Sequence, residues 1–157
     1  MSVPKVILLT GIPGAGKTTV SNALASRFER GVAIESDWLQ EIIVSGGLWP
    51  DEEPHDEAER QLTLKAQNAA LLADRFADAG FLPVIDDVIP GTHRLGIYLE
   101  ALSSRPVVLV VLAPLSKWRW PVTRVVATRR SATCGLIWTP RSARSSTVSA
   151  CGWTRKP

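Results

Sequence analysis

The chain has 157 residues, of which 45% are hydrophobic and 21% are charged, a composition typical of one globular domain. Its two cysteines define no disulfide framework, and no run approaches the roughly 18 apolar residues of a membrane span, so we expect a cytoplasmic protein without membrane association. The net charge of +3 is unevenly divided, because residues 1–100 carry eight basic and 15 acidic residues, whereas residues 101–157 carry ten basic residues and no acidic one.

Apolar patterns along residues 3–114 predict strands that alternate with helices. Runs rich in β-branched residues and leucine indicate strands buried in a parallel sheet, and apolar residues spaced three or four apart indicate helices. The predicted strands span 3–10, 31–37, 81–90 and 106–114, and the predicted helices span 17–28, 38–44, 56–79 and 93–103. Asp56 and Glu59 form a capping-box pattern at the start of the longest helix. This order predicts an α/β domain with a mostly parallel sheet of four strands.

A glycine-rich octapeptide joins the first predicted strand to the first predicted helix. Gly11, Gly16, Lys17 and Thr18 satisfy the pattern G-x-x-x-x-G-K-[ST] in its required strand–loop–helix context. The glycines let backbone N–H groups converge on phosphate oxygens, the lysine brings a positive charge to the β- and γ-phosphates, and the threonine hydroxyl suits Mg²⁺. We therefore predict a three-layer α/β/α P-loop NTPase domain. Its predicted nucleotide-binding residues are Gly11, Ile12, Pro13, Gly14, Ala15, Gly16, Lys17, Thr18 and Thr19.

Three carboxylates follow predicted strands, at the edge where ligands collect in open parallel sheets. Asp86 and Asp87 end the third strand in the segment PVIDDVI. An acidic residue there, beside a phosphate loop, can hold Mg²⁺, although a solvent-facing pair at a strand end would look the same. Alternation along a strand leaves open which of the two faces the loop. Asp37 ends the second strand, where it could accept the proton of a substrate hydroxyl or cap the following helix.

With the phosphate loop, the segment ESDWL and the segment VIDDVIPG, residues 3–113 resemble the chloramphenicol phosphotransferase-like family of P-loop kinases. The loop itself, GIPGAGKT, is closer to the zeta-toxin and AAA-type kinase relatives of that family. The resemblance implies ATP and Mg²⁺ as cofactors, Asp37 as catalytic base, and phosphoryl transfer to a small-molecule hydroxyl with Lys17 on the phosphates. It also implies an arginine-bearing lid and a fifth strand after the fourth strand.

The leading prediction is therefore a kinase whose partners are a nucleotide and a small hydroxylated molecule, such as a metabolite or an antibiotic. A polynucleotide or nucleotide-sugar kinase of the zeta-toxin sort would use the same residues. A nucleotide-binding module without turnover is a third reading, in which the lid has been lost. If residues 115–157 are a frameshift product, their basic charge is no evidence for nucleic-acid binding.

Residues 115–157 differ in composition from the preceding chain. They lack acidic residues, hold four of the six tryptophans and show no sustained helical or alternating period, so we expect an irregular segment. Reading the codons in a shifted frame with GC-rich choices converts residues 115–124 into an amphipathic helix with an arginine. We therefore predict that residues 1–114 form the kinase-like domain and that residues 115–157 are a frameshifted sequence replacing the lid helix and the last strand. In the frame as it stands, the candidate lid residues are Arg119, Arg124, Arg129 and Arg130.

Overall fold

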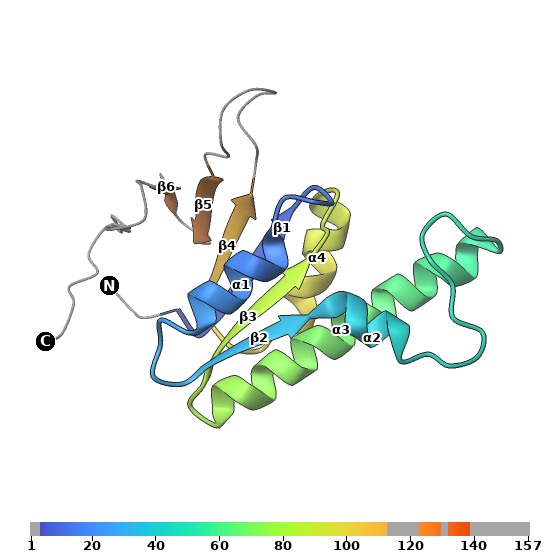
Figure 1. Ribbon diagram of the computed structural model, residues 1–157, viewed down its shortest axis with the longest axis horizontal. Coiled ribbons are helices and arrows are strands. Elements are labelled where there is room, and N and C mark those ends of the chain that lie inside the picture. Colours follow the sequence, from blue (N-terminus) through green and yellow to red (C-terminus); the bar gives the residue numbers. More distant parts are fainter. Residues whose placement is uncertain (1–3, 113–122, 130–131, 139–157) are drawn as a thin grey trace, which may run out of the picture.

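The computed structural model describes residues 4–112, 123–129 and 132–138 (Figure 1). In chain order the elements are β1 (Val6–Gly11), α1 (Lys17–Ala25), β2 (Gly31–Glu35), α2 (Ser36–Glu41), α3 (His55–Asp78), β3 (Leu82–Asp87), α4 (Thr92–Ala101), β4 (Val107–Leu112), β5 (Thr123–Arg129) and β6 (Ala132–Trp138). Within the described part of the chain, no helix is both long enough and apolar enough to cross a lipid bilayer.

Strands β1 to β4 form one parallel sheet in the order β2-β3-β1-β4. The register pairs Leu9 with Asp86 and Thr10 with Asp87, so the acidic end of β3 lies beside the end of β1. Because the strands are parallel, their C-terminal ends share one edge of the sheet. The α/β fold with a four-stranded parallel sheet, predicted from the sequence, is confirmed.

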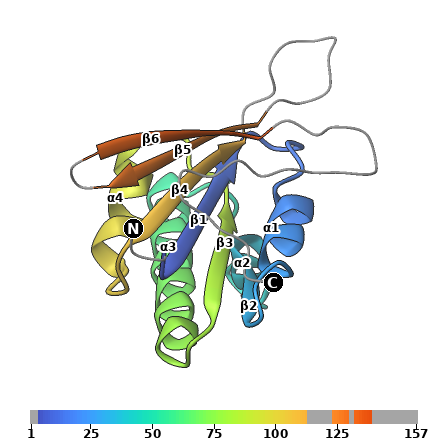
Figure 2. The ribbon, with the colours of Figure 1, turned by 90° about the vertical axis from the view of Figure 1, so that its left-hand side faces the viewer.

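Helices cover both faces of the sheet and form three layers, with α1 on one face and α3 and α4 on the other (Figure 2). Successive strand residues enter opposite cores. Leu8 and Ile85 belong to the core beneath α3 and α4, whereas Leu9 and Val84 belong to the core beneath α1. Each is fully buried, which is worth about 1.5–3 kcal/mol per aliphatic side chain. The alternation continues to the end of β3, so its last two residues face different layers.

Two helix starts differ from the sequence prediction. α2 has Glu35 at its N-cap and no side-chain cap, so Asp37 lies inside the first turn and does not cap the helix. α3 also begins without a side-chain cap, so the predicted capping box of Asp56 and Glu59 is wrong. The Asp37 and Glu59 carboxylates pair instead with cations on neighbouring helices, and α3 has Pro54 rather than Asp56 as its N-cap residue. Asp56 still lies in the first turn, where the helix dipole favours a negative charge.

β5 and β6 pair as an antiparallel hairpin, with Val125 opposite Leu136, and form a second sheet of two strands. This pairing differs from the irregular segment expected over residues 115–157. Its β-branched residues, among them Val126 and Thr128, favour an extended backbone even without a clear alternating pattern. The frameshift and the candidate lid side chains concern residues or side chains that lie outside the described part of the structure.

Candidate functional site

The phosphate loop occupies residues 12–16, between β1 and α1, at the C-terminal edge of the sheet (Figure 1). Gly16 precedes α1 with a φ of +77°, in the left-handed region that glycine adopts without strain. The Ala15 amide donates to the Ile12 carbonyl at 3.1 Å, and Lys17 Nζ lies 3.5 Å from the same carbonyl oxygen. Amides in the first turn of a helix have no carbonyl partner within it, so this helix start suits an anion.

Asp86 extends from the end of β3 toward the start of α1. Thr18 Oγ1 donates a hydrogen bond to Asp86 Oδ2 at 2.8 Å, while Asp86 Oδ1 is buried without a hydrogen-bond partner among the described residues. Burial raises the pKa of Asp86, and the charges of Asp37 and Glu35 add to the rise, against the opposing effects of the Thr18 hydrogen bond and the Lys17 charge. Among the described residues, no cation forms an ion pair with Asp86.

Asp87 points to the opposite face of the sheet, between α3 and α4. Lys65 Nζ donates to Asp87 Oδ1 at 2.8 Å, and the Tyr98 hydroxyl donates to Asp87 Oδ2 at 2.7 Å. The Asp87 side chain is 1% exposed, the Lys65 side chain is 7% exposed, and Tyr98 is completely buried. Of the two adjacent aspartates, Asp86 thus faces the phosphate loop and Asp87 faces away from it.

The same lysine reaches a third carboxylate, on α2. Lys65 Nζ donates to Asp37 Oδ1 at 3.0 Å, and the Asp37 side chain is 59% exposed. Burial acts to lower the pKa of Lys65, but the carboxylates of Asp87 and Asp37 outweigh it and raise that pKa above the ordinary lysine value. Burial and the Asp87 carboxylate likewise raise the pKa of Tyr98. At neutral pH the cluster therefore contains a charged ammonium and a protonated hydroxyl.

Lys65 and Tyr98 are the members of this site that sequence reasoning missed. Lys65 lies on the face of α3 that buries Leu62, Ala66 and Ala69, where the helical period leads one to expect an apolar residue. Lysine is almost never fully buried unless it is paired, and that mismatch is the signal that could have identified it. Tyrosine on the buried side of α4 carries a similar signal, because a buried phenol needs a hydrogen-bond partner.

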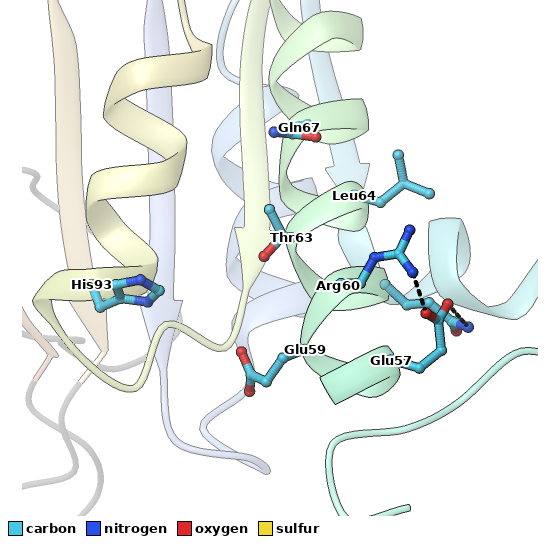
Figure 3. Close-up of a pocket in the computed structure, with 8 residues that line it drawn as sticks. Glu57, Glu59, Arg60, Thr63, Leu64, Gln67 and His93 are labelled. Carbon is cyan, nitrogen blue, oxygen red and sulfur yellow. Dashed lines mark hydrogen bonds and ion pairs between the residues drawn. The ribbon is translucent and has the colours of Figure 1, made fainter. Parts of the chain in front are cut away.

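A separate shallow pocket of about 490 Å³ lies on α3 beside the start of α4 (Figure 3). Its lining residues are Glu57, Glu59, Arg60, Gln61, Thr63, Leu64, Gln67 and His93. Arg94 Nη2 donates to both oxygens of Glu59, at 3.1 and 2.9 Å, and so ties α4 to α3. None of the phosphate-loop residues and none of the three site carboxylates lines this pocket, so we place the candidate site at the sheet edge.

The family described as an AAA domain matches residues 7–111, whereas no curated protein matches the chain significantly. A sugar kinase structure from Janibacter sp. HTCC2649 has a TM-score of 0.53 and 21% identity, over 73% of this chain and 62% of its own. A chain of the Pnkp1/Rnl/Hen1 complex has a TM-score of 0.50 and 16% identity, over 90% of this chain and 51% of its own. The chain thus spans between half and two thirds of the length of these structures, and at such identities the likeness shows a shared fold.

Proposed function

The chain belongs to the AAA-domain family, and on this premise we propose that it is an ATP-dependent phosphotransferase that moves the γ-phosphate to the hydroxyl of a small molecule. The observation that carries the proposal is the gathering of three features at one sheet edge: the phosphate loop, the Thr18–Asp86 pair and the exposed Asp37 carboxylate. A phosphate loop alone suits any nucleotide hydrolase. An exposed carboxylate near it suits transfer to a hydroxyl.

Residues 11–19 would bind the phosphates of ATP. The loop amides and the first turn of α1 supply hydrogen-bond donors, and the Lys17 ammonium supplies a full positive charge. Phosphoryl transfer asks the protein mainly to position the reactants and to offset charge on the transferred group. The loop would do both for the γ-phosphate.

Thr18 and Asp86 fit a Mg²⁺ ion. Mg²⁺ usually takes only one or two carboxylates from the protein and completes its shell with water and substrate phosphates, so the lack of a larger cluster of His, Cys and acidic residues in the described chain is compatible with it. The buried, unpartnered Asp86 Oδ1 and the raised pKa of its carboxyl support the assignment. When bound, the ion would neutralise charge on the β- and γ-phosphates. Asp87 is engaged by Lys65 and Tyr98, so we assign it no metal role.

Asp37 would act as the general base. The oxygen of the acceptor hydroxyl forms a bond to the γ-phosphorus while its proton passes to Asp37, the bond from the γ-phosphorus to the bridging oxygen breaks, and ADP leaves. Lys65 occupies Asp37 Oδ1, which leaves Oδ2 to receive the proton. A base of this kind contributes about 10²- to 10⁴-fold in rate.

An ATP-consumption screen over hydroxylated metabolites and antibiotics tests the proposal. Asp37→Asn removes the base, and Asp78→Asn makes the same chemical change on an exposed residue at the far end of α3. We expect Asp37→Asn to lower transfer at least about 100-fold with ATP affinity unchanged, and Asp78→Asn to change neither. Normal transfer by Asp37→Asn would show that the base is assigned wrongly. ATP binding without transfer to any acceptor would favour a nucleotide-binding module without turnover.

Two finer proposals remain, of which the first follows from the segments ESDWL and VIDDVIPG and the second from the two cysteines, which define no disulfide framework. We propose a relationship to the chloramphenicol phosphotransferase-like kinases and a cytoplasmic site of action. Chloramphenicol and an oligonucleotide with a free 5′-hydroxyl belong in the same screen. Transfer to the oligonucleotide alone would favour the polynucleotide-kinase alternative over a small-molecule kinase.

We also propose that the kinase-like domain ends near residue 114 and that residues 115–157 are read out of frame. The support is compositional, because all 15 acidic residues lie within residues 1–100. Sequencing of the coding DNA around codons 113–116 tests this, and an alternative frame interrupted by stop codons would contradict it. A frame-restored chain, assayed beside the present one, would show whether the altered segment limits turnover.

A further inference from the structure

We propose that Lys65 is a positioning residue for Asp37: its buried ammonium, anchored by Asp87, holds in one orientation a carboxylate that would otherwise rotate freely in solvent. The effect on reaction rate rests on the proposed function. The proposal that Lys65 fixes the Asp37 side chain does not rest on the proposed function, because it concerns only groups present in the folded protein.

Buried partners hold the Lys65 ammonium in place. Its side chain is 7% exposed and bonds to Asp87, which is 1% exposed and is bonded in turn by the fully buried Tyr98. A continuous chain of hydrogen bonds therefore runs from Tyr98 on α4, through Asp87 on β3 and Lys65 on α3, to Asp37 on α2. Three packed elements thus determine where the ammonium lies.

Among the described residues, Asp37 has no comparable anchor of its own. It lies in the first turn of a six-residue helix, and its side chain is 59% exposed. An exposed side chain exchanges between staggered rotamers within picoseconds to nanoseconds. The bond from the fixed ammonium to Oδ1 selects one rotamer. A general base must lie within hydrogen-bond reach of the proton it removes, and a misplacement of about 1 Å can lower a rate about 100-fold.

Charge compensation of Asp87 does not explain the contact with Asp37. One ammonium next to one buried carboxylate is already neutral, and Lys65 has a second carboxylate partner. A contact with so exposed a carboxylate contributes little to stability, because water competes for both charges. The consequence of the contact is that the Asp37 carboxylate is held in one direction.

The test compares the wild type with Lys65→Met/Asp87→Asn, which removes the bond to Asp37 without leaving a buried charge behind. Asp74→Asn is the matched control on the same helix, because it weakens the bonds from the Ser103 and Ser104 amides, both 2.8 Å, without involving the cluster. The first readout is the pair of Hα–Hβ scalar couplings of Asp37, measured by NMR without nucleotide or acceptor. The second is the transfer rate beside the ATP dissociation constant.

We expect couplings of a single rotamer in the wild type and in Asp74→Asn, and averaged couplings in the double variant. We also expect transfer by the double variant to fall about 10- to 100-fold with ATP affinity within about twofold. A single rotamer in the double variant would overturn the proposal. Averaged couplings in the wild type would overturn it too, and that measurement needs no variant to fold. If the couplings become averaged but the rate is unchanged, the positioning stands and the assignment of Asp37 as base is what fails.

Discussion

Replacing Lys65 with methionine should lower the free energy of unfolding by about 3–5 kcal/mol, because it removes the cation paired with Asp87, which is 1% exposed and would keep only Tyr98 as a partner among the described residues. Lys65→Met/Asp87→Asn removes the charge together with its partner, and asparagine still accepts the Tyr98 hydrogen bond. We therefore expect the double variant within about 1–2 kcal/mol of the wild type. Asp37→Asn should cost less than about 1 kcal/mol, because its side chain is 59% exposed.

Urea unfolding at pH 7, followed by circular dichroism at the helix band, measures all four proteins. The comparison is valid where the dependence on urea has the same slope in each, which indicates a common change in exposed surface. The decisive quantity is the difference between Lys65→Met and the double variant. If the double variant were no more stable than Lys65→Met, an uncompensated Asp87 charge could not be the cause of the loss. If Asp37→Asn cost as much as Lys65→Met, the exposure argument would be refuted.

For three further changes, the structure determines whether stability or ATP binding should rise or fall. Asp86→Asn should abolish the Mg²⁺ dependence of ATP binding. It should also raise the melting temperature of the nucleotide-free protein, because the raised pKa of Asp86 makes its charge destabilising at neutral pH. Calorimetry with and without Mg²⁺ checks both. Gly11→Ala should lower stability by about 1–3 kcal/mol and weaken binding of a fluorescent ATP analogue, because a Cβ there would lie 2.6 Å from the Leu112 carbonyl oxygen. Above about pH 10 the unfolded chain loses protons that Lys65 and Tyr98 keep in the fold, so stability should fall as the pH rises, by at most about 1.4 kcal/mol per pH unit for each group. Urea titrations at pH 9 and pH 11 check this, and an equal loss in Lys65→Met/Tyr98→Phe would contradict it.

The phosphate loop and the acidic strand ends could be predicted because their signals are local. A glycine pattern between a strand and a helix, and carboxylates directly after buried strands, are visible within a few residues of sequence. The choice between Asp86 and Asp87 is not local, since it depends on which helix covers which face of the sheet. Once α1 and the phosphate loop are known to lie on the Val84 side of β3, alternation assigns Asp86 to the loop.

The pairing of Lys65 with two carboxylates could be recognised only in the tertiary structure. Its partners are 28 and 22 residues away along the chain, and nothing near position 65 in the sequence indicates them. Helix periodicity treats a lysine as a surface residue, so the sequence pattern identified the apolar face of α3 and passed over the one cation on it. The predicted capping box was wrong because α3 begins at His55, which places Asp56 inside the first turn, and because Glu59 pairs with Arg94 on α4.

The two adjacent aspartates at the end of β3 serve opposite sides of the sheet. Asp86 meets the helix that begins at the phosphate loop, and Asp87 meets the lysine that reaches the proposed base. The two residues are adjacent, about 3.3 Å apart along a strand. One peptide unit therefore separates the side proposed to bind phosphates from the side proposed to bind the acceptor. A one-residue slip of β3 against β1 would turn both carboxylates to the wrong layer. The geometry of the proposed reaction therefore depends on the same backbone pairing that holds Leu9 beside Asp86 in the sheet.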